Sequence, residues 1–152
     1  MIRSTLCYIE REGHYLMLLR NKKKNDPNSG KWIGVGGKFE EGETPEQCVK
    51  REVFEETGIK LTETVFKGVI FFRSDIYEDE EMYLFTAEVP GNIDHSPDCN
   101  EGDLKWIRKE DVLSLSLWEG DRCFLKLLLE GKAVINMTLV YEGDKLTEVI
   151  TE

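Results

Sequence analysis

The hydrophobic positions of this chain follow two patterns, one with a period of two and one with the spacing of a helix. Apolar residues alternate with polar ones, or form short runs rich in β-branched and aromatic side chains, over residues 2–9, 14–20, 64–73 and 81–89. Such runs are typical of β-strands. A polar turn at 10–13 joins the first two, and residues 133–141 and 145–150 predict a closing hairpin around 142–144.

One helix is marked at both of its ends. Thr44 is a suitable N-cap, Pro45 suits the first helical position, and Gln47 completes a capping box. Gly58 is placed to end this helix in the left-handed conformation. A second helix is predicted over 119–130, whereas 21–31 is a loop, 32–35 is a short extended piece, and 100–107 is a loop leading into a short strand. Strands interleaved with two helices predict a mixed α/β chain.

The composition predicts one soluble domain spanning residues 1–152. The chain is 40% hydrophobic and 33% charged, which is ordinary for a globular protein, and no apolar run approaches the roughly 20 residues that cross a membrane. The N-terminal residues resemble a strand and not a secretory signal. The four cysteines lack CxxC spacing, so we expect reduced thiols in a cytoplasmic protein and no zinc site.

Charge is distributed unevenly along the chain. The net charge of −10 argues against a nucleic-acid polymer as partner, since such binding depends on neutralising phosphates. Residues 20–38 nevertheless carry six basic side chains and one acidic one, and residues 39–57 carry seven glutamates and two basic side chains. Two solvated faces would give this pattern. A site that holds a small polyphosphate through lysines and metal ions would give it as well.

The acidic helix places three carboxylates close together. Glu52, Glu55 and Glu56 fall within an arc of about 100° when each residue turns the helix by about 100°, and Val49 and Val53 flank them toward the core. Two carboxylates about 5 Å apart repel by about 3 kcal/mol at an effective dielectric constant of about 20. Either this face is fully solvated or a divalent cation neutralises it. Mg²⁺ prefers carboxylate and carbonyl oxygens, and the glycine pair at 36–37 allows a backbone carbonyl to approach.

The surroundings of these glutamates resemble a known family. The stretch GKFEEGETPEQCVKREVFEETGI, residues 37–59, fits the Nudix box G-x5-E-x7-R-E-U-x-E-E-x-G-U, in which U is aliphatic, at every specified position. The matching residues are Gly37, Glu43, Arg51, Glu52, Val53, Glu55, Glu56, Gly58 and Ile59. The resemblance to MutT-like Nudix hydrolases, of the 8-oxo-dGTP diphosphatase type, extends over most of the chain. It implies an α/β/α sandwich with a mixed β-sheet and a catalytic loop–helix.

The resemblance also implies a reaction and the residues that perform it. Nudix hydrolases cut a diphosphate linked to another moiety, using Mg²⁺ or alternatively Mn²⁺. The resemblance implies Glu56 as the general base. Glu101 is the second candidate, because similar enzymes supply a glutamate five residues before a Trp, and Trp106 stands at that interval. Alternatively, Glu101 is an ordinary acidic residue of a loop. The pair Glu43 and Arg51 would orient the loop against the helix. The implied metal ligands are Glu52, Glu55, Glu56, Glu101 and the carbonyl of Gly37.

Further positions resemble substrate contacts of the MutT-like enzymes. Lys38 matches a lysine that meets a phosphate, and Arg20 is placed to act likewise, whereas residues 22–24 read as solvated loop lysines. In the purine-binding segment Trp118 and Asp121 match, but Gly120 replaces the first of two Asp residues. Ile33 stands where the mammalian-type enzymes have an Asn. Phe72 and Trp118 can form a stacking platform, although core packing is an alternative for both.

The leading prediction is a nucleoside triphosphate pyrophosphohydrolase that releases a nucleoside monophosphate and pyrophosphate. Its expected substrate is 8-oxo-dGTP or another modified purine dNTP, with no membrane and no nucleic-acid polymer as partner; the sequence leaves the oligomeric state open. One alternative is another Nudix specificity such as a dinucleoside polyphosphate, for which Tyr77 is a weak marker. The other is a nucleotide sensor without activity, against which the intact box argues.

Overall fold

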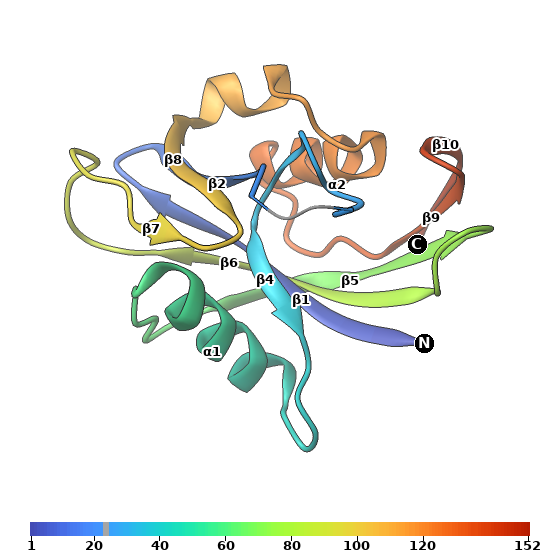
Figure 1. Ribbon diagram of the computed structural model, residues 1–152, viewed down its shortest axis with the longest axis horizontal. Coiled ribbons are helices and arrows are strands. Elements are labelled where there is room, and N and C mark those ends of the chain that lie inside the picture. The colour runs from blue at the N-terminus through green and yellow to red at the C-terminus, as the bar shows by residue number, and fades with distance from the viewer. Residues whose placement is uncertain (23–24) are drawn as a thin grey trace.

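The fold is built around one large mixed sheet with a helix on each face. The structure is a computed structural model that describes residues 1–22 and 25–152. The main path of the sheet runs β10-β9-β5-β6-β1-β2-β8-β7, while β3 pairs with β2 and β4 pairs with β1. In Figure 1 helix α1 lies below the sheet and helix α2 above it, which confirms the predicted α/β sandwich. No helix in the described part of the chain is both long and apolar enough to span a bilayer.

Most elements lie close to their predicted bounds, but β7 and η1 have no predicted counterpart, β9 begins at Met137 and not at residue 133, and one predicted loop is a strand. The strands are β1 (Ile2–Arg11), β2 (His14–Arg20), β3 (Trp32–Ile33), β4 (Val35–Lys38), β5 (Val65–Ser74), β6 (Glu80–Glu88), β7 (Asp98–Cys99), β8 (Gly102–Arg108), β9 (Met137–Glu142) and β10 (Lys145–Thr151). The helices are α1 (Pro45–Thr57), the 3₁₀ helix η1 (Lys109–Ser114) and α2 (Glu119–Leu129). The loop predicted over 100–107 is wrong, because residues 102–108 form a strand that pairs antiparallel with the whole of β2.

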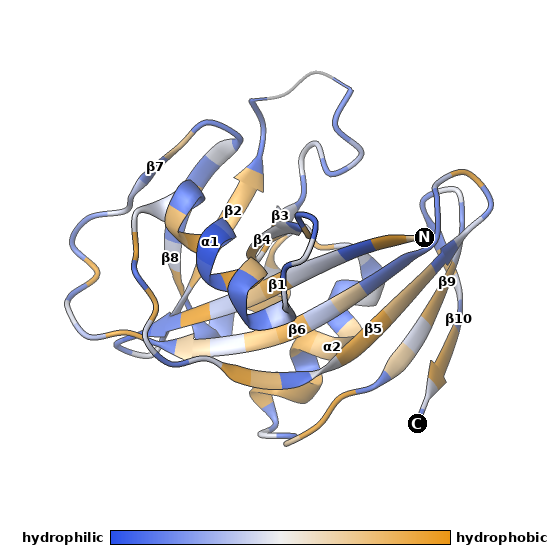
Figure 2. Cartoon of the chain, turned by 90° about the horizontal axis from the view of Figure 1, so that it is seen from below, coloured by the Kyte–Doolittle hydropathy of each residue, from blue (hydrophilic) through white to orange (hydrophobic). Residues whose placement is uncertain are grey.

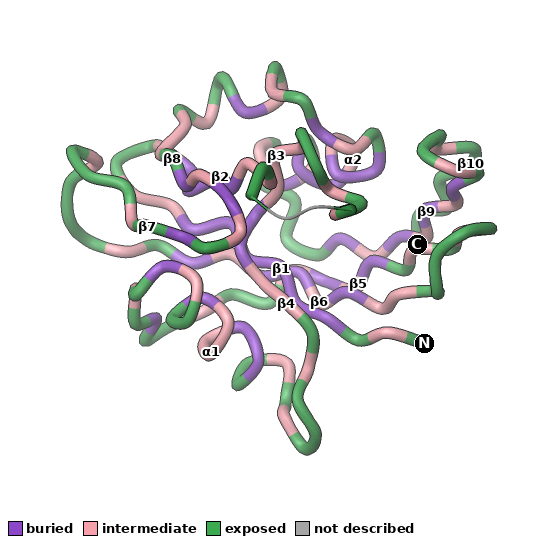
Figure 3. Tube along the Cα trace, in the orientation of Figure 1, coloured by how far each residue is buried: buried purple, intermediate pink, exposed green. Residues whose placement is uncertain are grey.

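Strand β1 organises the sheet because three other strands pair with it. It runs parallel to β6 from Ile2 to Glu10, and its other edge pairs antiparallel with β4. Alternate residues of β1 therefore point into two separate cores. Leu6 and Tyr8 pack on the α2 side, and Cys7 and Ile9 pack on the α1 side. Figure 3 shows the buried central strands between more exposed loops.

Helix α1 has the ends that the sequence predicts. The Thr44 side chain accepts a hydrogen bond from the Gln47 amide at 3.2 Å, and the Thr44 amide donates to the Gln47 side chain at 3.0 Å, which is the predicted capping box. Gly58 adopts a φ of 75° and its amide donates to the Phe54 carbonyl at 2.8 Å. Val49 and Val53 are buried against the sheet. Figure 2 shows both hydrophilic and hydrophobic segments on α1, whose exposed residues include the apolar Phe54.

All four cysteines are free thiols, and three of them are buried. Burial raises the pKa of the Cys48 thiol to about 11. The protonated Cys48 thiol faces the carbonyl of Gly37, with the sulfur 3.7 Å from the carbonyl oxygen. The thiols thus contribute as packed, neutral side chains.

Candidate active site

A cavity of about 680 Å³ opens beside β1 and β4, between the start of β6 and helix α2. Its lining includes nine of the twelve residues predicted to be catalytic, metal-binding or substrate-binding: Arg20, Gly37, Lys38, Glu52, Glu56, Phe72, Glu101, Trp118 and Asp121. Three others, Glu43, Arg51 and Glu55, do not line it. The cavity therefore joins an acidic end, supplied by α1, to an aromatic end beside α2.

The acidic end begins where β4 meets α1. Gly37 pairs with Thr5 of β1, and a Cβ atom on Gly37 would lie 2.4 Å from the carboxyl carbon of Glu52. Only glycine leaves room for that carboxylate, so the absence of a side chain at residue 37 sets the position of Glu52. Burial raises the pKa of Glu52, and Arg51 opposes this effect.

Arg51 joins the loop before α1 to the helix itself. Its guanidinium donates to both oxygens of Glu43, at 2.6 and 2.9 Å, so the expected ion pair is present. This pairing lowers the pKa of Glu43 to about 2. The same guanidinium donates to the Lys38 carbonyl at 3.1 Å. Both ends of the loop at residues 39–44 are thereby held against α1.

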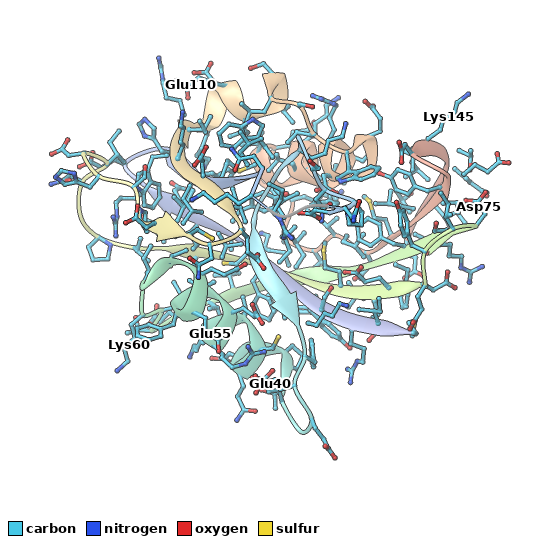
Figure 4. All side chains as sticks on the ribbon, viewed as in Figure 1. Glu40, Glu55, Lys60, Asp75, Glu110 and Lys145 are labelled. Carbon is cyan, nitrogen blue, oxygen red and sulfur yellow. The ribbon has the colours of Figure 1, made fainter. Side chains whose placement is uncertain are left out.

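The same Arg51 also contacts two of the three clustered carboxylates. It donates to Glu52 at 2.8 Å and to Glu55 at 3.1 Å. The Glu55 side chain is 55% exposed, and Figure 4 labels it on α1, toward the outside of the molecule, with Glu40 on the preceding loop. The two explanations that the sequence left for this face, full solvation or a divalent cation, are therefore incomplete. An arginine of the same helix neutralises part of the charge.

Glu56 is the one of the three clustered carboxylates that Arg51 does not contact, and the more distant Arg20 only partly offsets its charge. The residue is half-buried, and its buried Oε2 atom has no hydrogen-bond partner among the described residues. Burial, followed by a hydrogen bond with Glu101, raises the pKa of Glu56. A hydrogen bond between two carboxyl groups needs a shared proton, so in the absence of a cation the pair Glu56 and Glu101 holds one proton.

Arg20 reaches Glu101 from the other side. Its Nη1 lies 3.3 Å from Glu101 Oε2, while its Nε donates to Asp26 at 2.7 Å. The Asp26 side chain is only 4% exposed, so the ion pair fixes Arg20 in a defined orientation. Arg20, which the sequence offers as a phosphate contact, is thus also a positioning residue for the loop that carries Glu101.

The donor set at the acidic end fits a hard divalent cation by its chemistry. The set combines carboxylate oxygens of Glu52, Glu56 and Glu101 with the carbonyl of Gly37, and a buried carboxylate oxygen without a partner is what such an ion would satisfy. No three acidic, thiol or imidazole side chains of the described residues are gathered to hold a metal as they stand. Binding therefore requires these carboxylates to turn from their present partners toward the ion.

The aromatic end is formed by Trp118 and Phe72. Trp118 precedes the first residue of α2, its indole N–H donates to Asn28 at 2.8 Å, and its ring meets Tyr141 edge-on at 5.7 Å. Lys31 lies over the same ring at 5.5 Å. Trp118 and Phe72 are partly exposed and line the cavity while also packing on the α2-side core. Both rings therefore pack on the core and also present part of their surface to the cavity.

Gly120 and Asp121 differ in what their positions allow. Asp121 is buried, and burial, followed by repulsion from Glu80, raises its pKa to about 7. A Cβ atom on Gly120 would lie 2.6 Å from the Tyr141 hydroxyl, which accepts a hydrogen bond from the Gly120 amide at 2.7 Å. Tyr141 therefore occupies the space that a side chain at residue 120 would need.

The remaining residues named from the sequence are Tyr77 and the lysines at 22–24. Tyr77 lines the rim of the cavity and is 47% exposed. Lys22 is exposed and its ammonium donates to the Cys99 carbonyl at 2.8 Å, while Lys23 and Lys24 lie outside the described residues. Sequence reasoning missed a further set of lining residues, which are Ser4, Asp26, Asn28, Glu80, Met82 and Tyr141. Strand alternation could have placed Ser4, Glu80, Met82 and Tyr141 on the cavity face once strand pairing was known. Asp26 and Asn28 lie in the loop between β2 and β3, which strand alternation does not describe.

Comparison with known proteins agrees with this geometry. A model of the NUDIX domain family matches residues 2–128. The chain belongs to the Nudix family. The uncharacterized Nudix hydrolase YvcI of Bacillus subtilis is 30% identical over 145 residues, which cover 91% of this chain and 86% of that protein. The oxidized purine nucleoside triphosphate hydrolase of Danio rerio is 32% identical over 148 residues, covering 95% and 90%.

A crystal structure of a MutT protein from Bacillus halodurans matches this fold with a TM-score of 0.85 and 27% identity, covering 100% of this chain and 98% of that one. The chain is accordingly a Nudix hydrolase with the fold of MutT proteins. Enzymes of this family generally use divalent metal ions. The acidic end of the cavity is the part of this chain whose donors suit such an ion.

Proposed function

We propose that this Nudix hydrolase is a Mg²⁺-dependent nucleoside triphosphate pyrophosphohydrolase that acts on 8-oxo-dGTP or another modified purine dNTP. The observation that carries the proposal is the cavity of about 680 Å³, which places the carboxylates of α1 and an aromatic pocket at opposite ends of one space. The similarity to the Danio rerio oxidized purine nucleoside triphosphate hydrolase supports a purine substrate.

The side chains divide the work between the two ends. The purine stacks on Trp118 and Phe72, and Lys38 and Arg20 contact the phosphates from the cavity wall. Glu52, Glu56, Glu101 and the Gly37 carbonyl would hold Mg²⁺, whereas the exposed Glu55 lies outside the cavity lining and would have to turn to join them. Bound Mg²⁺ supplies positive charge that offsets the phosphate oxygens and makes the attacking water more acidic.

The bond changes follow from the products. The water oxygen forms a bond to the β-phosphorus, and the bond from that phosphorus to the oxygen bridging the α-phosphate breaks. The nucleoside monophosphate leaves with the bridging oxygen, and pyrophosphate remains. Glu56 accepts the proton of the water, because its carboxylate lines the acidic end of the cavity and its buried Oε2 atom is unpartnered among the described residues. Glu101, held to Arg20, is the alternative base.

A substrate panel tests this proposal. Pyrophosphate release is compared for dGTP, 8-oxo-dGTP, other nucleoside triphosphates, dinucleoside polyphosphates and ADP-ribose, with and without Mg²⁺. We expect purine triphosphates to have the highest kcat/KM, with pyrophosphate and a monophosphate as products. A clear preference for ADP-ribose or dinucleoside polyphosphates would overturn the substrate assignment, and no Mg²⁺-dependent cleavage of any compound would support the non-catalytic sensor.

A further inference from the structure

One acidic residue interrupts an otherwise apolar or small-residue face of the sheet. On β1 the residues that face α2 are Ile2, Ser4, Leu6 and Tyr8, and on β6 they are Glu80, Met82 and Leu84, since Leu6, Tyr8, Met82 and Leu84 all pack in the α2-side core. Glu80 lies opposite Ile2 on one neighbouring strand and opposite Phe72 on the other. A carboxylate on such a face costs stability unless it is hydrogen-bonded or has a functional use.

Glu80 is held in place by a neighbour. The buried Ser4 hydroxyl donates to Glu80 Oε2 at 2.5 Å, across the diagonal between β1 and β6. Both residues line the cavity, whereas their neighbours Arg3 and Glu81 pair with each other away from it. No hydrogen bond of the described residues engages Oε1 of Glu80, so the carboxylate keeps acceptor capacity toward the cavity.

A second carboxylate faces the same space from α2. Asp121 lines the cavity, its residue is only 7% exposed, and its carboxylate makes no hydrogen bond with a described residue. Repulsion from Glu80 contributes, after burial, to raising the pKa of Asp121, so the two carboxylates lie within electrostatic reach. At residue 120, by contrast, Tyr141 leaves no room for any side chain. The second acceptor beside Asp121 therefore comes from the sheet.

These two carboxylates determine which edge of a base the pocket favours. Ionised carboxylates only accept hydrogen bonds, so they match a ring edge rich in N–H donors. The Watson–Crick edge of a 2-amino-6-oxopurine presents N1–H and both hydrogens of the 2-amino group side by side. Hypoxanthine has the same ring and the same 6-oxo group but lacks the amino group.

We propose that Glu80 and Asp121 together bind the N1–H and 2-amino groups of a guanine-type base, so that the enzyme selects 2-amino-6-oxopurine triphosphates over hypoxanthine-type ones. This inference rests on the proposed function and specifies the substrate class of the same site. Glu80 contacts the 2-amino group, Asp121 contacts the N1–H side, and Ser4 orients Glu80. The stacking surface of Trp118 and Phe72 leaves both carboxylates at the ring edge.

The experiment compares dGTP with dITP, which differ only in the 2-amino group. The ratio of kcat/KM values is measured at pH 8 for the wild-type protein, Glu80→Gln and Asp79→Asn. Asp79 is the exposed neighbour of Glu80 that does not line the cavity, so Asp79→Asn removes the same charge without touching the pocket. Binding of the products dGMP and dIMP, measured by calorimetry, reads the base pocket without hydrolysis. Thermal melting checks that each variant is folded.

The wild-type protein should prefer dGTP, and Glu80→Gln should lower the dGTP:dITP ratio roughly tenfold to hundredfold, the effect expected for losing a hydrogen bond to a charged group. Asp79→Asn should keep the wild-type ratio. A ratio near one in the wild type, or an unchanged ratio in Glu80→Gln, overturns the inference and leaves the hydrolase intact. If neither triphosphate is cleaved, the proposed function fails. Tighter binding of dGMP than of dIMP that is lost in Glu80→Gln would then still support the base contact. Equal affinities of the wild-type protein for dGMP and dIMP would overturn it.

Discussion

Asp121 provides a prediction that links the substrate pocket to the stability of the fold. Its carboxyl has a pKa of about 7 in the folded protein, against 3.8 in its ordinary state, because it is buried and faces Glu80. The folded protein therefore binds more protons than the unfolded chain between these pH values, and stability falls as the pH rises from about 4 to about 7. Asp121→Asn keeps the shape of the side chain and removes this titration.

The size of the effect follows from the shift. The pKa difference corresponds to a cost of about 4 kcal/mol at pH 8 and about 2 kcal/mol at pH 5. Burial of the Asn amide in the variant changes the free energy of unfolding by the same amount at both pH values, because an amide does not titrate. The free energy of unfolding of Asp121→Asn relative to the wild type should thus improve by about 2–3 kcal/mol between pH 5 and pH 8.

Urea denaturation at the two pH values measures this difference, with Asp79→Asn as a control whose exposed side chain should show no such change. The same substitution should lower kcat/KM for purine triphosphates, because a base contact is lost. Equal effects of Asp121→Asn on stability at pH 5 and pH 8 would show that the carboxyl does not titrate in this range. The reasoning from burial would then be wrong.

Two glycines give further predictions. Gly37→Ala places a Cβ atom 2.4 Å from the Glu52 carboxyl carbon, so we expect Glu52 to be displaced and kcat at saturating Mg²⁺ to fall about a hundredfold. The melting temperature of the variant shows whether it is folded. Activity within twofold of the wild type would contradict this prediction. Gly120→Ala places a Cβ atom 2.6 Å from the Tyr141 hydroxyl and 2.7 Å from Leu139, so the free energy of unfolding measured in urea should fall by about 1–3 kcal/mol. An unchanged midpoint of denaturation would mean that Tyr141 can move aside without cost.

Local features of the structure could be predicted from the sequence, because local chemistry determines them. The capping residues Thr44 and Gln47 and the terminal Gly58 define α1 through hydrogen bonds within four residues of one another. The alternation of β1, β2, β5 and β6 is likewise a property of each segment. Strand β8 was not predicted over its full length, because it is defined by pairing with β2, which lies more than eighty residues earlier in the chain.

The candidate site divides in the same way. The Nudix box identifies Glu52, Glu55 and Glu56, but it does not show that Arg51 contacts two of them while Glu56 stays buried against Glu101. Glu80 lies just before the strand predicted over 81–89, and only the register with Ile2 and Phe72 reveals that it faces the cavity.

We propose that the clustered carboxylates of α1 hold Mg²⁺ and activate water. The most direct test measures the rate of pyrophosphate release from 8-oxo-dGTP as a function of Mg²⁺ concentration. The wild-type protein, Glu56→Gln and Glu46→Gln are compared; Glu46 lies in the first turn of the same helix and pairs with Lys50, away from the cavity. We predict release that requires Mg²⁺, an undiminished rate in Glu46→Gln, and a fall of roughly a hundredfold to ten-thousandfold in Glu56→Gln. Equal rates with and without Mg²⁺, or full activity in Glu56→Gln, would contradict this assignment.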